Sequence, residues 1–152
     1  MEIRPYNDPD LEDLVALFTS SVHVLGAPLY GPEQLNAWAP HPPEIEFWRK
    51  RLLGVHLIVA TDESKLAGFI SYEENGHIDL LYTDPIFQRR GVATRLLLYV
   101  EQILEGIELF TEASLVAKPF FLKHNFCIVE EQTVSFRGVT FQRYAMRKAI
   151  VS

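Results

Sequence analysis

One stretch of the sequence decides how the chain is read: Leu80-Leu81-Tyr82-Thr83-Asp84-Pro85-Ile86-Phe87-Gln88-Arg89-Arg90-Gly91-Val92-Ala93-Thr94. It predicts a strand, a turn marked by Pro85, a basic loop and a helix that begins at Gly91. The first amides of a helix have no partner inside it and carry the positive end of its dipole, which suits a phosphate group. Gly91 and Ala93 are small, and Arg89 and Arg90 add positive charge. We therefore predict a site for a phosphorylated cofactor; the competing interpretation is an ordinary connection with two exposed arginines.

The composition is that of one globular domain spanning residues 1–152. Hydrophobic residues make up 48% of the chain and charged residues 22%, and the formal net charge is −6. This acidic balance argues against nucleic-acid binding, which needs a basic surface. We expect no membrane span and no signal peptide, and we favour a cytoplasmic location. Cys127 is expected to be a small core residue, and the histidines show no metal-ligand spacing, so no metal site is predicted.

The hydrophobic pattern predicts two kinds of segment before the basic loop. Helices are expected from Asp8-Pro9 to about Val22, over 32–38 and from Pro42-Pro43 to Gly54. Strands are expected over 2–5, 56–61, 66–72 and 77–83, the last two joined at Asn75-Gly76.

After the loop we expect a helix over 91–105, a strand over 108–111 and a helix over 114–124. A closing hairpin of strands 126–135 and 140–147 should turn at Arg137-Gly138.

The order of the predicted helices and strands resembles that of the GNAT acyltransferases. That family carries a Gln/Arg-x-x-Gly-x-Gly/Ala loop, which Gln88-Arg89-Arg90-Gly91-Val92-Ala93 resembles. A second match is Ser114 to Phe126, which is similar to the family segment Asn-x-x-Ala-x-x-Phe-Tyr-x-Lys-x-Gly-Phe. Ala-Lys-Pro-Phe-Phe and the segment Tyr30 to Ala39 are similar to a branch of small bacterial members. The resemblance implies an α/β (α+β) GNAT fold: a mixed central sheet of six to seven strands with flanking helices, and strand 108–111 parallel to strand 77–83 through a right-handed crossover.

The resemblance also implies an N-acetyltransferase that moves an acetyl group directly from acetyl-CoA to a small amine acceptor. The cofactor-binding residues implied are Leu81, Tyr82, Thr83, Gln88, Arg89, Arg90, Gly91, Val92, Ala93, Thr94, Ser114, Ala117, Phe120 and Phe121. The alternative from another class is a non-catalytic module of the same fold that binds an acyl-CoA and signals or oligomerises. A homodimer is left open. The net charge fits a cationic acceptor without requiring one.

The strand over residues 77–83 offers a general base. If side chains alternate, His77 and Asp79 share one face, and Ile78, Leu80 and Tyr82 share the other. Asp79 is the first candidate, acting directly or through water, and His77 is the second. The competing interpretation makes Asp79 part of a local network and places His77 at the solvent end of the strand.

Position 121 departs from the family pattern. Many relatives have a tyrosine there that can protonate the departing thiolate of CoA, whereas Phe121 cannot. We expect Phe121 to pack along the pantetheine arm, and the hydroxyl to come from Tyr82, Tyr144 or Tyr30, or the thiolate to leave with help from backbone or water.

Aromatic residues in and near the variable helical region suggest an acceptor pocket. The predicted acceptor residues are His23, Tyr30, Trp38 and Tyr144. A hydrophobic core beneath that region is the competing interpretation, and it is preferred for Trp48.

Overall fold

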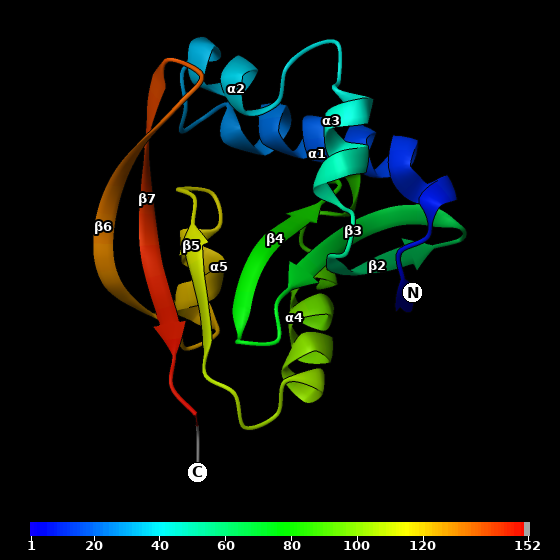
Figure 1. Ribbon diagram of the computed structural model, residues 1–152, viewed down its shortest axis with the longest axis vertical. Coiled ribbons are helices and arrows are strands. Elements are labelled where there is room, and N and C mark those ends of the chain that lie inside the picture. Colours follow the sequence, from blue (N-terminus) through cyan, green and yellow to red (C-terminus); the bar gives the residue numbers. More distant parts are fainter. Residues whose placement is uncertain (151–152) are drawn as a thin grey trace.

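The computed structural model describes residues 1–150 and forms one mixed sheet covered by helices on both faces (Figure 1). Along the chain its elements are β1 (Glu2–Pro5), η1 (Asp8–Asp10), α1 (Leu11–Gly26), α2 (Pro32–Trp38), α3 (Ile45–Arg51), β2 (His56–Asp62), β3 (Lys65–Tyr72), β4 (His77–Thr83), η2 (Pro85–Phe87), α4 (Val92–Ile103), β5 (Leu109–Ala113), α5 (Lys118–Lys123), β6 (Cys127–Phe136) and β7 (Val139–Lys148). The predicted number and order of the main elements are confirmed.

The sheet has seven strands in the order β1-β2-β3-β4-β5-β7-β6. Neighbouring strands are antiparallel except for β4 and β5, which are parallel as predicted. Tight turns join β2 to β3, β3 to β4 and β6 to β7, whereas β4 reaches β5 through α4, as a parallel connection requires.

The parallel pair β4–β5 is short. Its register holds only two pairs, His77 with Phe110 and Ile78 with Thr111. Beyond them the two strands separate, as the gap between β4 and β5 in Figure 1 shows. Because β4 continues to Thr83, its last residues pair with β3 on one side and have no strand partner on the other.

Two hydrophobic clusters cover opposite faces of the sheet. One is centred on α4, whose Leu96, Leu97 and Val100 are fully buried, and also takes in Phe121. The other lies under α1, α2 and α3 and includes Leu14 and Trp48. The prediction that Trp48 is a core residue is confirmed.

A β-bulge in β4 changes the predicted alternation. The register with β3 shifts so that Tyr72 faces Ile78 and Ser71 faces Leu80, which leaves Asp79 as the additional residue. Consequently Ile78 packs on the α4 side, but Leu80 and Tyr82 pack on the α1 side. The expectation that Ile78, Leu80 and Tyr82 share a face is therefore wrong, because a bulge adds a residue that strict alternation does not anticipate.

Two local predictions are also corrected. Helix α5 begins at Lys118 rather than Ser114, with Pro119 in its first turn, where a residue without an N–H is well tolerated. Cys127 is exposed rather than buried, because β6 is the edge strand of the sheet and most of its side chains face solvent.

Candidate active site

The loop before α4 presents a continuous run of free backbone donors. Arg89 and Gly91 both have positive φ angles, +65° and +76°, which turn the chain sharply into the helix. Within residues 1–150, no backbone N–H from residue 89 to residue 94 donates to a protein acceptor. The space around Gly91 is open, since a Cβ there would meet nothing within 4 Å. Such a concave run of amides at a helix start can accept an anion.

The side chains of this loop support the same role for its backbone. Arg89 and Arg90 are exposed, and Arg90 lies over the Phe87 ring, 5.3 Å from its centroid, with Asp62 at 3.7 Å. Val92 is buried in the α4 cluster, so only its amide is available to a ligand. Thr94 Oγ1 lies 3.1 Å from His124 Nε2.

Two pockets meet where β4 and β5 separate. The first, about 210 Å³, lies between β4, β5 and the β6–β7 hairpin. The second, about 250 Å³, runs from this gap towards the basic loop, where Gln88 and Ala93 line it. Both pockets are lined by Trp38, Leu81, Tyr82, Ser114 and Ala117. We call the first the acceptor pocket, after the expected acceptor residues Tyr30 and Trp38 in its lining, the second the loop pocket, and the five shared residues the junction.

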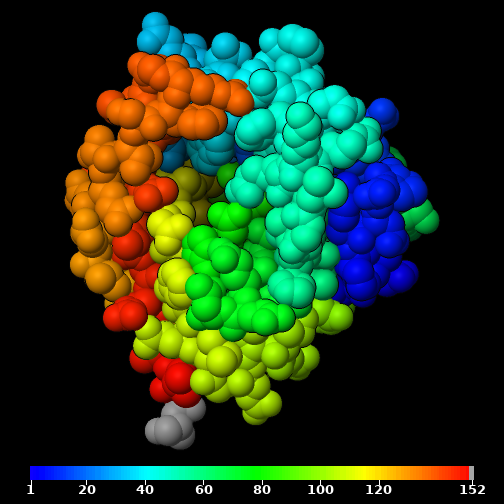
Figure 2. Space-filling model, viewed as in Figure 1, coloured from blue at the N-terminus to red at the C-terminus, as the bar shows by residue number. Residues whose placement is uncertain are grey.

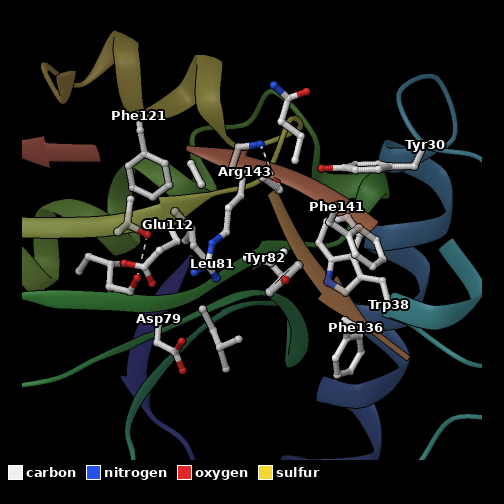
Figure 3. Close-up of a pocket in the computed structure, with 18 residues that line it drawn as sticks. Tyr30, Trp38, Asp79, Leu81, Tyr82, Glu112, Phe121, Phe136, Phe141 and Arg143 are labelled. Carbon is white, nitrogen blue, oxygen red and sulfur yellow. Dashed lines mark hydrogen bonds between the residues drawn. The ribbon is translucent and has the colours of Figure 1, made fainter. Parts of the chain in front are cut away.

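Figure 2 shows the acceptor pocket as a hollow between the β6–β7 hairpin and the chain segments around α3 and β4. Six aromatic residues line it: Tyr30, Trp38, Tyr82, Phe121, Phe136 and Phe141. Three charged residues also line it, namely Asp79, Glu112 and Arg143 (Figure 3).

Both acidic residues of this pocket have cationic or imidazole partners. Asp79 Oδ2 accepts a hydrogen bond from Arg51 of α3 at 2.8 Å. Glu112 Oε1 lies 2.8 Å from His77 Nε2, while His77 Nδ1 contacts Glu73. Burial lowers the pKa of His77, but the hydrogen bonds to Glu73 and Glu112 outweigh it, so the pKa is raised overall. His77 therefore supports Glu112 from outside the pocket lining.

Tyr82 stands at the junction with its hydroxyl in a weakly polar environment. Burial, partly opposed by a hydrogen bond from Trp38, raises the pKa of Tyr82 to about 12. Its ring packs against Phe18 and Phe69, with ring centroids 4.9 and 5.5 Å apart. At neutral pH the hydroxyl therefore keeps its proton and can donate it but cannot act as a base.

Tyr30 and Phe121 complete the wall on the β5 side. The Tyr30 hydroxyl accepts a hydrogen bond from the Leu115 amide at 2.8 Å, and burial raises its pKa. Phe121 is only 2% exposed and packs edge-on against Phe120 and Phe126. It lines the acceptor pocket, whereas Phe120 lines the loop pocket.

Two of the predicted acceptor residues lie outside both pocket linings. His23 Nε2 is 2.7 Å from the Ala39 carbonyl oxygen, and its ring packs on His41. The Tyr144 ring lies beneath the Lys118 ammonium group, 4.2 Å from the ring centroid. Tyr30 and Trp38 do line the acceptor pocket.

Residues that the sequence did not single out also line this pocket. Glu112 comes from β5, and Phe136, Phe141 and Arg143 come from the closing hairpin. Alternation along that hairpin predicts that every second side chain faces inward, but it does not say which cavity they face.

Comparison with known proteins decides the family. The sequence matches the acetyltransferase (GNAT) domain over residues 27–148. The chain belongs to the GNAT acetyltransferase family. It is 37% identical over 147 residues to the uncharacterized N-acetyltransferase YafP of Escherichia coli (strain K12), covering 97% of this chain and 95% of YafP. The resemblance inferred from the sequence is thus confirmed, and this family member is an N-acetyltransferase that uses acetyl-CoA.

Solved structures agree with this GNAT assignment. A GCN5-related N-acetyltransferase from Rhodopseudomonas palustris superposes with a TM-score of 0.92 at 31% identity, covering 98% of this chain and 95% of that one. The PaiA N-acetyltransferase from Thermoplasma acidophilum, solved with coenzyme A, shares the fold, with a TM-score of 0.73, 23% identity and 97% coverage of both chains. The non-catalytic alternative is not favoured by these matches.

Two further properties concern residues 1–150. No helix there is long and apolar enough to cross a membrane. No cluster of three or more histidine, cysteine or acidic side chains there has a geometry that could hold a metal ion. In contrast, the free amides of residues 89–94 and the open space at Gly91 fit the pyrophosphate of acetyl-CoA.

Gly91→Val should abolish or greatly weaken CoA binding while the fold survives. A β-branched side chain strains the left-handed conformation at Gly91 and intrudes on the open space where the pyrophosphate is expected. Gly106→Val is the matched control, because Gly106 has a similar φ of +82° and equally open surroundings just beyond α4. Calorimetric CoA titration of both folded variants should show a loss only in Gly91→Val; equal affinities would contradict the loop assignment.

Proposed function

We propose that the acceptor is a small molecule whose primary amine enters the acceptor pocket and is acetylated at the junction. The observation that carries this proposal is the meeting of the two pockets at five shared residues. A ligand arm from the basic loop and a molecule from the opposite side would reach the same point there. A pocket volume of about 210 Å³ favours a small acceptor over a folded protein surface.

The reaction requires only modest help from the protein. Acetyl-CoA supplies a thioester, whose carbonyl carbon forms a bond to the amine nitrogen while its bond to sulfur breaks. The amine must be neutral to attack, so its ammonium form first loses a proton, and the nitrogen loses a second proton after bond formation. One proton ends on the departing sulfur, giving CoA and an acetamide.

Asp79 is the proposed base, acting directly or through water. It lines the acceptor pocket, and the bulge places it on the same side of the sheet as Tyr82. Arg51 donates to Oδ2, so Oδ1 would take the proton, either directly or from an intervening water. His77 is the second candidate, acting through its contact with Glu112.

Tyr82 is the proposed proton donor to sulfur. It lines both pockets and remains protonated at neutral pH. Phe121 offers only an apolar ring at the position where many relatives have a tyrosine. We propose that Phe121 and Phe120 exclude water from the cofactor arm.

For the other contacts to acetyl-CoA, we propose the cofactor-binding residues that the sequence analysis predicts. We also propose a cytoplasmic location, where acetyl-CoA is produced, and a homodimer stays a prediction.

The proposed function is tested by incubating the protein with acetyl-CoA and a panel of small primary amines. Thiol release should depend on the amine, and mass spectrometry should find the acetamide in equal amount. Hydrolysis of acetyl-CoA that no amine accelerates would argue against it.

Asp79→Asn should lower the turnover number by about 10²-fold or more, the scale for a positioned acid or base, with little change in CoA affinity. Arg51→Gln separates this role from the ion pair, since it removes the partner and leaves the carboxylate. Steady-state rates for both variants decide the matter. If Arg51→Gln reproduces the whole loss, Asp79 acts through the ion pair, and His77 becomes the leading candidate.

Tyr82→Phe should lower turnover by about 10²-fold at pH 7 to 9 while CoA still binds. Because the pKa of Tyr82 is about 12, the wild-type rate should not fall from its ionisation below about pH 11. Tyr30→Phe is the control, since it removes the hydroxyl of the other tyrosine that lines the acceptor pocket. A pH–rate profile in which Tyr30→Phe alone is impaired would transfer the donor role to Tyr30.

A further inference from the structure

Arg143 is the charged residue of the acceptor pocket that has no ion-pair partner. It lies on β7, half-buried, and its Nε donates to Gln132 Oε1 at 2.8 Å. Across residues 1–150, no carboxylate oxygen lies within 4.0 Å of its guanidinium nitrogens, and neither terminal nitrogen donates to a protein acceptor. An arginine is always charged and carries five N–H donors. Only the Nε donor of Arg143 has an acceptor among residues 1–150.

The two acidic residues of the pocket each have a partner of their own. Asp79 is paired with Arg51, and Glu112 contacts His77, which also contacts Glu73. Among residues 1–150, Arg143 is therefore the charged residue of the pocket lining without a charged or imidazole partner. A bound anion would find free N–H donors at Arg143, whereas both acidic residues already have partners.

Arg143 lies in the same pocket as Tyr82, at which acetyl transfer is proposed. Figure 3 shows its side chain extending from β7 into the pocket, with the guanidinium group between Glu112 and Tyr82 in that view. Tyr82 belongs to the junction, so an anion held by Arg143 shares one small cavity with the proposed point of transfer. The neighbouring walls formed by Trp38, Phe136 and Phe141 are apolar and aromatic.

We propose that the acceptor carries a carboxylate close to its amine, and that Arg143 binds this carboxylate. The fork of guanidinium N–H groups matches a planar carboxylate in two parallel hydrogen bonds. The aromatic walls would take an apolar side chain. The substrate class is thus small amino acids with apolar side chains, or close analogues. This inference rests on the proposed function and adds the identity of the acceptor class to it.

A purely structural role for Arg143 is the alternative explanation that the experiment must distinguish from carboxylate binding. Gln132 and Arg143 face each other across the β6–β7 hairpin, so their hydrogen bond could serve only to brace that hairpin. A brace would affect all acceptors alike, whereas a carboxylate-binding residue affects only acceptors that carry the anion.

The experiment compares acceptors matched in shape: phenylalanine with phenethylamine, leucine with 3-methylbutylamine, and the phosphonate analogue of phenylalanine. The wild type should favour each amino acid over its amine in kcat/KM by about 10- to 100-fold, the range for a charge-assisted hydrogen bond. Arg143→Gln should remove this preference by lowering kcat/KM for the amino acids alone, and Arg143→Lys should retain part of it. Arg147→Gln is the control, because Arg147 lies on the same strand but pairs with Glu108 at 2.6 Å.

The outcomes are distinguishable. Equal kcat/KM within the matched pairs, or an equal loss for both members in Arg143→Gln, overturns the inference while acetylation of the amines upholds the proposed function. Failure of every acceptor although CoA binds would overturn both. If the phosphonate and phenylalanine have equal kcat/KM values that both depend on Arg143, the result supports an anion site. A strong preference for the phosphonate would overturn the assignment to a carboxylate.

Discussion

The separation of β4 from β5 is the constraint on which the site depends. Two parallel strands that pair along their length leave no space between them, but here pairing stops after Ile78 and Thr111. The backbone groups of β4 beyond this point face a gap, and buried polar backbone groups need partners. A ligand that supplies hydrogen bonds there completes the sheet. The loop pocket and the acceptor pocket share residues at this gap, so the interruption of one strand pair would provide both the binding path and the proposed point of reaction.

The bulge at Asp79 then determines which side chains reach that gap. With strict alternation, Tyr82 would have lain on the α4 side of the sheet together with Ile78. The additional residue returns Leu80 and Tyr82 to the α1 side, where Tyr82 meets Trp38 and the closing hairpin. Bulges are common beside active sites because they redirect one side chain without interrupting the sheet.

The sequence predicted correctly those elements whose structure depends on residues close together in the chain. The strand, turn and helix around Gly91 depend on residues within one short segment, and the order of elements follows from hydrophobic periodicity. The acceptor pocket depends on contacts between distant segments: Arg143 and Phe141 come from the last strand and Glu112 from β5. His23 lies in the expected helical region, but its contact with Ala39 draws it into local packing, and no pattern in the sequence indicated that contact. The face of Tyr82 was mispredicted for a similar reason, because the bulge arises from pairing with β3.

The low polarity of the junction connects the two proposed roles of acid and base. Burial raises the pKa of Tyr82 because its charged form, a phenolate, is poorly solvated there. The same environment disfavours an ammonium ion, so an amine that reaches the junction loses its proton more readily than in water. Part of the deprotonation is thus achieved by the apolar surroundings, and a base that is tied to Arg51 need supply less of it. The five junction residues themselves carry no charged side chain, which suits a neutral nucleophile.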